Sequence, residues 1–315
     1  MRSNSKRSDQ SEVIFRERNN SQTETQIPKI QPNQFERMTE WQIIWRNFHK
    51  NRGAVIALIV LILLVLTAIF AEWIAPYDPL EQGHDLLQPP SSKHLFGTDT
   101  LGRDMFSRVI FGARISLMVG IGAVFVSLIV GLMFGMSGGY FGRWVDAFVV
   151  MGVDSFMAFP GLLLAMVIAA LLSPTIPTVM FAVGLGEFTL FARMIRSTVF
   201  VEKQKDYILA AKSIGASDYL IIGIHILPNT FPPLIVLTTL TVGSAILMAS
   251  SLGFLGLGAQ PPIPEWGNMT NVGRAYLQIA PWLIWFPGAA IMITVLAANM
   301  LGDGLRDALD PRLRR

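Results

Sequence analysis

The sequence contains a series of long apolar segments, and these segments constrain the fold more than any other feature. A helix needs ~20 mainly apolar residues to cross the ~30 Å hydrocarbon core of a bilayer. Six segments meet or approach this length, at residues 53–75, 115–136, 145–172, 176–192, 233–257 and 281–301. Because a backbone in lipid must satisfy its hydrogen bonds internally, the sequence predicts an all-α membrane protein, a polytopic bundle of six transmembrane helices.

Composition agrees with a membrane protein and excludes several kinds of site. Of the 315 residues, 52% are hydrophobic and only 15% are charged, against ~25% charged in an ordinary soluble domain. There is no cysteine, which excludes disulfides and thiolate sites. The four histidines are scattered, and the net charge of +3 is too small to favour nucleic acid. We therefore expect no metal, no cofactor and no nucleic-acid partner.

The N-terminal residues differ from the rest of the chain. Residues 1–40 are rich in Ser, Asn, Gln, Arg and Glu, and they have too few large apolar residues to offset the entropy of ordering. We expect a disordered tail there, without a cleavable signal peptide. Residues 41–52 (WQIIWRNFHKNR) mix aromatic and basic side chains, which is typical of a short helix at the membrane interface.

The second apolar segment has a repeating face of small residues. Small side chains recur at every fourth position: Ala123, Ser127, Gly131, Gly135 and Gly139. Such a face lets another helix approach closely. We expect a packing surface, with a permeation stripe as the functional alternative.

Basic residues predict the orientation in the membrane, because short loops rich in Lys and Arg stay in the cytoplasm. Such residues precede the first segment and follow the second, fourth and sixth segments. They all lie on one side if the chain crosses six times, with both termini in the cytoplasm. Residues 76–113 then lie outside, although they carry basic residues that roughly balance their acidic ones.

Two carboxylates fall within predicted spans, where charged groups are costly and usually face a cavity or a partner. Asp154 precedes Pro160 in the third span, and Glu187 lies in the fourth. Asp154 could make a structural polar contact or belong to a gate. Glu187 could be paired within the bundle or could line a transport path.

The sequence carries no motif of an enzyme. It lacks a G-x-x-x-x-G-K-[ST] phosphate loop, an H-E-x-x-H zinc motif and a G-x-S-x-G nucleophile elbow. We therefore expect a protein that is not an enzyme, so that any use of ATP must come from another chain.

A polar segment separates the fourth and fifth apolar segments. Its first half, Asp206–Ile214, predicts a short helix that Gly215 ends in a left-handed conformation. Ser217 can then cap a second helix, with Asp218 in its first turn and Pro228 closing it. The turn is surrounded by small residues: Ala210, Ala211 and Ala216. Such a helical pair at the cytoplasmic face suits insertion into a groove on a soluble partner.

This polar segment resembles the EAA loop of ABC-importer permeases. The matching pattern is A-A-x-x-x-G, nine residues, then x-x-L-P, and its matches are Ala210, Ala211, Gly215, Leu227 and Pro228. The Glu of the pattern is Leu209 here, and its Ile is His225.

Three further stretches are similar to permeases of the dipeptide, oligopeptide and nickel class. They are HLFGTDTLGRDMFSRVIFGARISL (94–117), SLGFLGLGAQPPIPEWGNM (251–269) and GDGLRDALDPRLRR (302–315). The resemblance covers residues 45–315, and the order of its motifs is similar to that of the second, C-type permease subunit.

The resemblance implies a type I ABC-importer permease fold in the cell membrane. Residues 53–114 would hold the first span and a long extracytoplasmic segment, residues 115–305 the permease core, residues 206–228 the coupling loop, and residues 306–315 a cytoplasmic tail. The implied partners are a second homologous permease, two ATPase subunits, an extracytoplasmic substrate-binding protein, membrane lipid and a peptide substrate.

The resemblance also assigns roles to residues. Those coupling the permease to the ATPases would be Asp206, Leu209, Ala210, Ala211, Gly215, Ala216, Ser217 and Pro228. Those facing the binding protein would be Asp99, Arg103, Asp104, Glu265 and Trp266. Asp154 and Glu187, selected above by their depth in the spans and not by the resemblance, are the candidates for the translocation path or its gate.

Other functions stay open at this point. Within the same class, the substrate could be nickel, a metal chelate or another solute. A proton-coupled secondary transporter with Glu187 or Asp154 as relay would explain the buried carboxylates. It would not explain the coupling-like segment, and the sequence shows no internal repeat of the kind many such transporters carry. A structural membrane scaffold is the third possibility.

Overall fold

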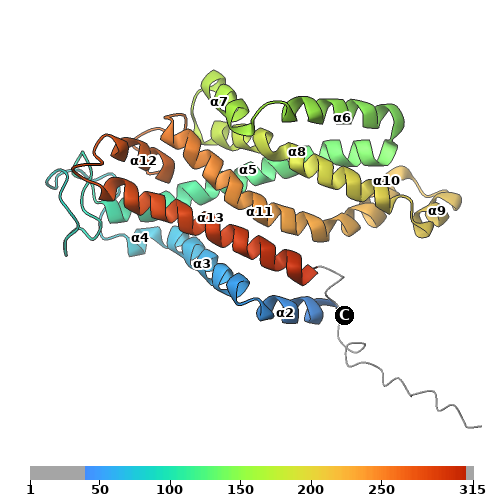
Figure 1. Ribbon diagram of the computed structural model, residues 1–315, viewed down its shortest axis with the longest axis horizontal. Helices are drawn as coiled ribbons and strands as arrows, with labels where there is room; N and C mark the ends of the chain where they lie inside the picture. Colours follow the sequence, from blue (N-terminus) through green and yellow to red (C-terminus); the bar gives the residue numbers. More distant parts are fainter. Residues whose placement is uncertain (1–39, 310–315) are drawn as a thin grey trace, which may run out of the picture. The chain divides into compact units, whose positions relative to one another are not determined.

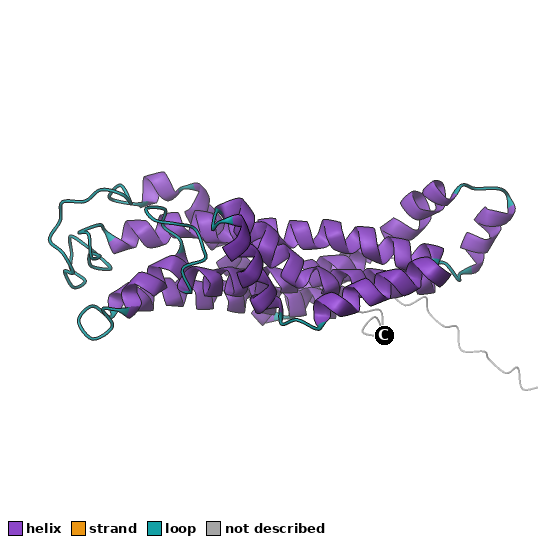
Figure 2. Ribbon diagram, turned by 90° about the horizontal axis from the view of Figure 1, so that it is seen from above, coloured by secondary structure: helices purple, strands orange, loops and turns teal. Residues whose placement is uncertain are grey.

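The structure, a computed structural model, describes residues 40–309, but only the backbone at residues 40, 41 and 43. The tail predicted at residues 1–40 therefore lies almost entirely outside the described residues, as do residues 310–315. Within the described part, all regular structure is helical (Figure 2). Residues 44–309 belong to one structural unit, and the description below concerns its helices.

The helices follow one another with short connections, except for the long loops before α5 and around α12. In chain order they are α2 (Glu40–Lys50), α3 (Arg52–Ile69), α4 (Ala71–Ile74), α5 (Met105–Phe141), α6 (Arg143–Met157), α7 (Gly161–Leu172), α8 (Ile176–Glu202), α9 (Asp206–Ser213), α10 (Asp218–Leu220), the π-helix η2 (Ile221–Ile226), α11 (Leu227–Phe254), α12 (Trp266–Arg274) and α13 (Trp282–Leu309).

Five described helices are long and apolar enough to cross a membrane. They are α3, α5, α8, α13 and the continuous helix Asp218–Phe254 that α10, η2 and α11 form together. The pair α6 and α7 makes a sixth candidate only if the two bent helices count as one span. The prediction of an all-α membrane bundle is confirmed, with six spans on this count.

The predicted third span is wrong as a straight helix. Residues 145–172 are divided between α6 and α7, whose axes differ in direction by 85°. The break lies at Pro160, which precedes α7 in an extended conformation with ψ 128°. Proline has no N–H to donate and disfavours the helical conformation of the residue before it, so Phe159 and Pro160 form a corner.

Helix ends differ from the ends of the apolar segments because capping sets them. α5 begins at Met105, well before residue 115, since the Asp104 carboxylate accepts a 2.8 Å hydrogen bond from the Ser107 N–H. α8 extends to Glu202 rather than to residue 192, and α13 extends to Leu309, into the predicted tail. A helix, α2, also lies where the interfacial helix was predicted; its position in a membrane stays a prediction.

α5 and α8 pack closely along the predicted face of small residues. All five of its members, Ala123, Ser127, Gly131, Gly135 and Gly139, are buried. The Ser127 hydroxyl donates a 2.8 Å hydrogen bond to the carbonyl of Gly184 in α8. A Cβ atom at Gly135 would lie only 2.7 Å from the carbonyl oxygen of Ala192. The packing role of this face is therefore confirmed.

The long loops and the polar segment lie at opposite ends of the helices of residues 44–315. Figures 1 and 2 show the loop before α5 and the α12 region at one end, and α9 and α10 at the other. α13 lies along α3 and α11 between these ends (Figure 1). If the long axes of the spans cross a membrane, these two ends face opposite sides of it.

The α5–α8 contact generates a test of the packing. Gly135→Ala should destabilise the folded protein by about 1–3 kcal/mol, because the added methyl overpacks a contact with backbone on the other side. Thermal unfolding of the purified protein in detergent measures this. Gly152→Ala in α6 is the matched control, since a Cβ there meets nothing within 4 Å. Equal unfolding temperatures for the two variants would contradict the close crossing.

Candidate functional site

The polar segment folds into a helical hairpin, the α9–η2 hairpin (residues 206–226), whose turn is set by Gly215. Gly215 has φ +83°, as the left-handed cap requires. The N–H of Gly215 donates to the Lys212 carbonyl at 3.0 Å, and that of Ala216 donates to the Ala211 carbonyl at 3.1 Å. This pair of bonds is a Schellman motif. Ser217 takes the extended N-cap conformation before α10, although its side chain makes no capping hydrogen bond.

The prediction that Pro228 closes the second helix is wrong. The second arm continues through η2 into α11 as one helix, and Pro228 lies in the first turn of α11. The Leu227 N–H bonds to the carbonyl of Ile222, five residues back, as in a π-helix. The wide π turn accommodates a residue without an N–H at this junction. The second arm of the hairpin is therefore continuous with a candidate membrane span.

One side of the hairpin is packed against the bundle and the other is exposed. The buried side chains join the largest hydrophobic core of the described residues, and they are Ile208, Ala211, Ile221 and Ile226. Among the predicted coupling residues, Ala211 is buried and Ala216 is half-buried; the exposed ones are Asp206, Leu209, Ala210, Gly215, Ser217 and Pro228. The structure thus brings the predicted set together at one end of the bundle.

The tip of the hairpin exposes two large apolar side chains that the sequence analysis missed. Ile214 and Tyr219 flank the turn and are 86% and 91% exposed, and Leu209 nearby is 53% exposed. A signal was present in the sequence, since large apolar residues stand on both sides of a glycine turn in a polar segment. An exposed apolar cluster of this kind marks a contact surface.

Polar contacts hold the base of the hairpin to the end of α8. The Tyr207 hydroxyl donates to the Glu202 carboxylate, which also pairs with the Lys205 ammonium at 2.7 Å. Asn229 donates to the Tyr207 hydroxyl oxygen at 3.1 Å. Burial and the bond to Glu202 raise the pKa of Tyr207 to about 12, so its hydroxyl stays protonated and remains a donor at physiological pH.

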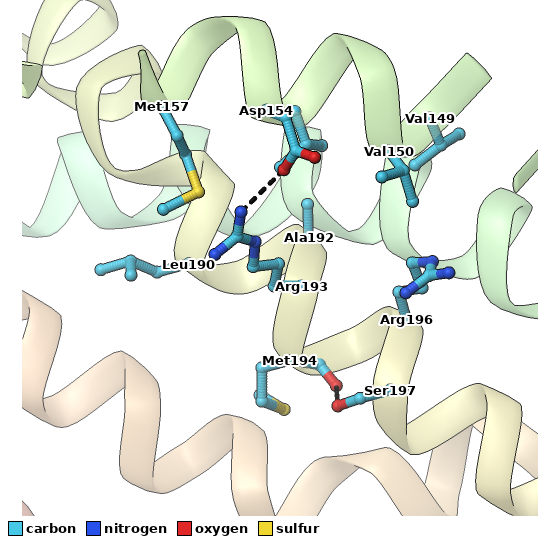
Figure 3. A pocket seen from close by; sticks show the side chains of 11 residues that line it. Val149, Val150, Asp154, Met157, Leu190, Ala192, Arg193, Met194, Arg196 and Ser197 are labelled. Carbon is cyan, nitrogen blue, oxygen red and sulfur yellow. Dashed lines mark hydrogen bonds and ion pairs between the residues drawn. The ribbon is translucent and has the colours of Figure 1, made fainter. Parts of the chain in front are cut away.

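A cavity of about 570 Å³ lies between α6 and α8, and the Asp154–Arg193 ion pair and the Arg196 side chain line it (Figure 3). Arg193 Nη2 lies 2.7 Å from the Asp154 carboxylate, and both side chains are about half exposed. Arg196 pairs with Asp146 through two hydrogen bonds, one of them 2.6 Å between Nη2 and Oδ2. Asp154, predicted from its depth in a span, therefore makes a polar contact with α8.

Glu187, the other predicted path residue, is buried within the bundle. Its side chain is 7% exposed, and it lies on α8 beside the Ser244 side chain of α11. No basic side chain pairs with it among residues 40–309. The carboxyl group thus sits between two candidate spans without a cationic partner in the described chain.

The predicted binding-protein residues before α5 are buried, which corrects the expectation that their side chains face outward. Asp99, Arg103 and Asp104 are 4%, 7% and 1% exposed. Asp99 accepts a 2.7 Å hydrogen bond from Arg103 Nε. Asp104 caps α5 and lies 2.9 Å from His94 Nδ1. These side chains add to the backbone hydrogen bonds of the loop, such as the 2.9 Å bond from the Asp99 N–H to the Arg103 carbonyl, and together they fix its shape.

Glu265 and Trp266 are buried in the same way, at 4% and 1% exposure. Glu265 caps α12 by accepting hydrogen bonds from the N–H groups of Gly267 and Asn268, at 2.7 and 2.8 Å. Burial raises the pKa of its carboxyl group. The Trp266 indole N–H donates to the Val109 carbonyl in α5 at 2.9 Å. Both residues anchor α12 to the bundle and offer little surface of their own.

Two sequence families match this chain. The family described as "Binding-protein-dependent transport system inner membrane component" matches residues 127–315. The family described as "N-terminal TM domain of oligopeptide transport permease C" matches residues 39–90. The first match includes the α9–η2 hairpin, the α6–α8 cavity and Glu187.

Curated relatives align over nearly the whole chain. A glutathione transport system permease protein, GsiD, of Escherichia coli O6:K15:H31 (strain 536 / UPEC) is 47% identical over 291 residues, 91% of this chain and 95% of the relative. A dipeptide transport system permease protein, DppC, of Alkalihalophilus pseudofirmus (strain ATCC BAA-2126 / JCM 17055 / OF4) is 44% identical over 282 residues, 89% of this chain and 93% of the relative.

A solved structure shares the fold. A chain of the MetNI methionine ABC transporter in an inward-facing conformation superposes with a TM-score of 0.53 at 18% identity. The match covers 65% of this chain and 98% of that chain.

Proposed function

The chain belongs to the family of binding-protein-dependent transport system inner membrane components, and from this premise we propose how its site works. As an ABC-importer permease subunit, it forms half of a translocation path for short peptides. The α9–η2 hairpin couples that path to separate ATPase subunits. Those subunits hydrolyse ATP, because this chain has no phosphate-binding loop.

The observation that carries this proposal is the two-sided hairpin. Its inner side chains are part of the main core, whereas Ile214 and Tyr219 at its tip are almost fully exposed. Its second arm continues without a break into α11. A soluble subunit that gripped the tip would therefore move the end of a membrane-spanning helix. The short apolar tip suits a pocket on that subunit, with exposed polar residues around it.

The other proposed partners would bind at the two ends of the bundle or beside it. A second, homologous permease would complete the path, and two ATPase subunits would bind at the hairpin end, in the cytoplasm. A substrate-binding protein would dock outside, on the loops that Asp99, Arg103, Asp104, Glu265 and Trp266 hold in shape. The protein would thus be a multi-pass protein of the cell membrane, with both termini in the cytoplasm.

The carboxylates between helices belong, in this proposal, to the path or its gate. Asp154 and Arg193 are half exposed in the α6–α8 cavity, so their ion pair is accessible to solvent and can open at small cost. α6 turns into α7 at the corner at Pro160, and its contacts with α5 and α8 would have to change for α6 to swing about that corner. Glu187 lies deeper, between α8 and α11, where a change of helix packing would expose it.

Short peptides are the proposed substrates. The relatives at 44–47% identity are named for the transport of glutathione, itself a tripeptide, and of dipeptides. Uptake of a labelled dipeptide by the complete complex, with its binding protein, should be competed by unlabelled dipeptides and by glutathione. It should not be competed by nickel ions. Competition by nickel but not by peptides would assign the other substrate class.

Gly215→Val tests the coupling role. A side chain at φ +83° costs ~1–2 kcal/mol in the left-handed conformation, and it would also widen the tip. Membrane levels should stay near normal, while substrate-stimulated ATP hydrolysis and uptake should fall together. Gly288→Val in α13 is the control, because a Cβ there meets nothing within 4 Å and φ is ordinary. Wild-type uptake by Gly215→Val, with its ATPases bound, would refute the coupling role.

Glu187→Gln tests the path role. Removing the charge while keeping the shape should leave assembly normal and lower peptide uptake about two- to fivefold, as expected for the loss of one polar interaction of ~0.5–1 kcal/mol. Asp303→Asn, at an exposed position of α13, should transport like the wild type. Unchanged uptake in Glu187→Gln would remove the residue from the path, and loss of the folded protein would make its role structural.

A further inference from the structure

Tyr140, in the last turn of α5, is a buried residue that neither the sequence motifs nor the proposed path uses. Its side chain is 7% exposed and belongs to the main core, together with Ile208 and Ile221 from the two arms of the α9–η2 hairpin. Packing alone would be satisfied by phenylalanine at this position. The hydroxyl therefore needs a separate explanation.

The polar contacts of Tyr140 go to both arms of the hairpin. Its hydroxyl donates to the carboxylate of Asp218, the first residue of the second arm. The ammonium group of Lys212, in the last turn of the first arm, lies over its ring at 5.1 Å from the centroid. A phenol bonded to a carboxylate and covered by a cation makes two charge-assisted contacts. One side chain of α5 thus contacts the hairpin on each side of the Gly215 turn.

The backbone at the same place is tied to α8. Lys203, directly after α8, donates from Nζ to the carbonyls of Gly139 and Tyr140, at 2.7 and 3.3 Å. These carbonyls belong to the C-terminal turn of α5, where a cation is favourable. Gly139 itself packs on Val199 of α8, where a Cβ would approach Val199 Cβ to 2.8 Å. The end of α5 therefore has little freedom to move relative to α8.

We propose that Tyr140 is the positioning residue that transmits displacement of the α9–η2 hairpin to the α5–α8 pair. The proposal rests on the coupling function given above. The bond to Asp218 fixes the second arm in register with α5, and the Lys212 contact fixes the first. When an ATPase moves the tip, the hairpin moves together with the spans instead of sliding over them. Without the hydroxyl, the apolar core still holds the hairpin near the bundle, but its register is no longer fixed.

The test measures peptide taken up per ATP hydrolysed, in proteoliposomes that contain the complete complex. Tyr140→Phe should insert normally and bind its ATPases, and this ratio should fall at least about fivefold, since a hydrogen bond to a charged group is lost. Asp218→Ala should lower it equally. The double variant should be no worse than either single one, because both remove the same contact. Asp218→Asn keeps an oxygen acceptor and should recover most of the ratio.

Control variants distinguish the role proposed for Tyr140 from the coupling function proposed for the hairpin. Asp307→Ala removes an exposed carboxylate at the end of α13 that has no ion pair among the described residues, and its ratio should equal that of the wild type. An unchanged ratio in Tyr140→Phe and Asp218→Ala, with substrate-stimulated ATP hydrolysis and uptake both lowered in Gly215→Val, would overturn the role of Tyr140 alone. If Gly215→Val also kept wild-type ATP hydrolysis and uptake, the proposed function of the hairpin would fail. Independent, multiplying losses in the double variant would also overturn the proposal.

Discussion

The close crossing of α5 and α8 is the contact on which the rest of the structure depends. Lipid tails are as apolar as leucine, so helices in a bilayer gain little from hiding apolar surface and associate through close packing and hydrogen bonds instead. The glycines of α5 bring its backbone against α8, and Ser127 adds a bond to Gly184. α6, α7 and α11 pack against this pair, and the buried side chains of the α9–η2 hairpin join the same core, so its rigidity sets their positions.

The second arm of the hairpin is continuous with α11, so a movement of the hairpin would also move α11. A proline at the start of a span usually marks a break, and a break would isolate the hairpin from α11. Here the π-helical turn η2 accommodates Pro228, which has no N–H to donate, and one helix extends from Asp218 to Phe254. The first arm is instead tied by Tyr207 and Lys205 to Glu202 at the end of α8. Each arm is therefore attached to a different candidate span.

Charged side chains differ in burial and in bonding along the length of the bundle. In the loop before α5, the charged side chains of Asp99, Arg103 and Asp104 are buried and bonded to other groups of the loop, so they stabilise its shape. Between α6 and α8 the ion pairs are partly exposed beside a cavity. Exposed pairs contribute little to stability and exchange readily. The loop before α5 is thus held by buried polar contacts, whereas the contact between α6 and α8 includes partly exposed ion pairs.

The sequence by itself determined the all-α membrane class, the small-residue face of α5, the left-handed turn at Gly215 and the family resemblance. These depend on local composition, spacing and backbone sterics. Only the tertiary structure decided the 85° corner at Pro160, the continuity through Pro228 and the burial of Glu265 and Trp266. The physical reason is that the effect of a proline depends on the local hydrogen bonding of its helix, and the burial of a charged side chain depends on the partners that neighbouring elements supply; hydropathy contains no information about either.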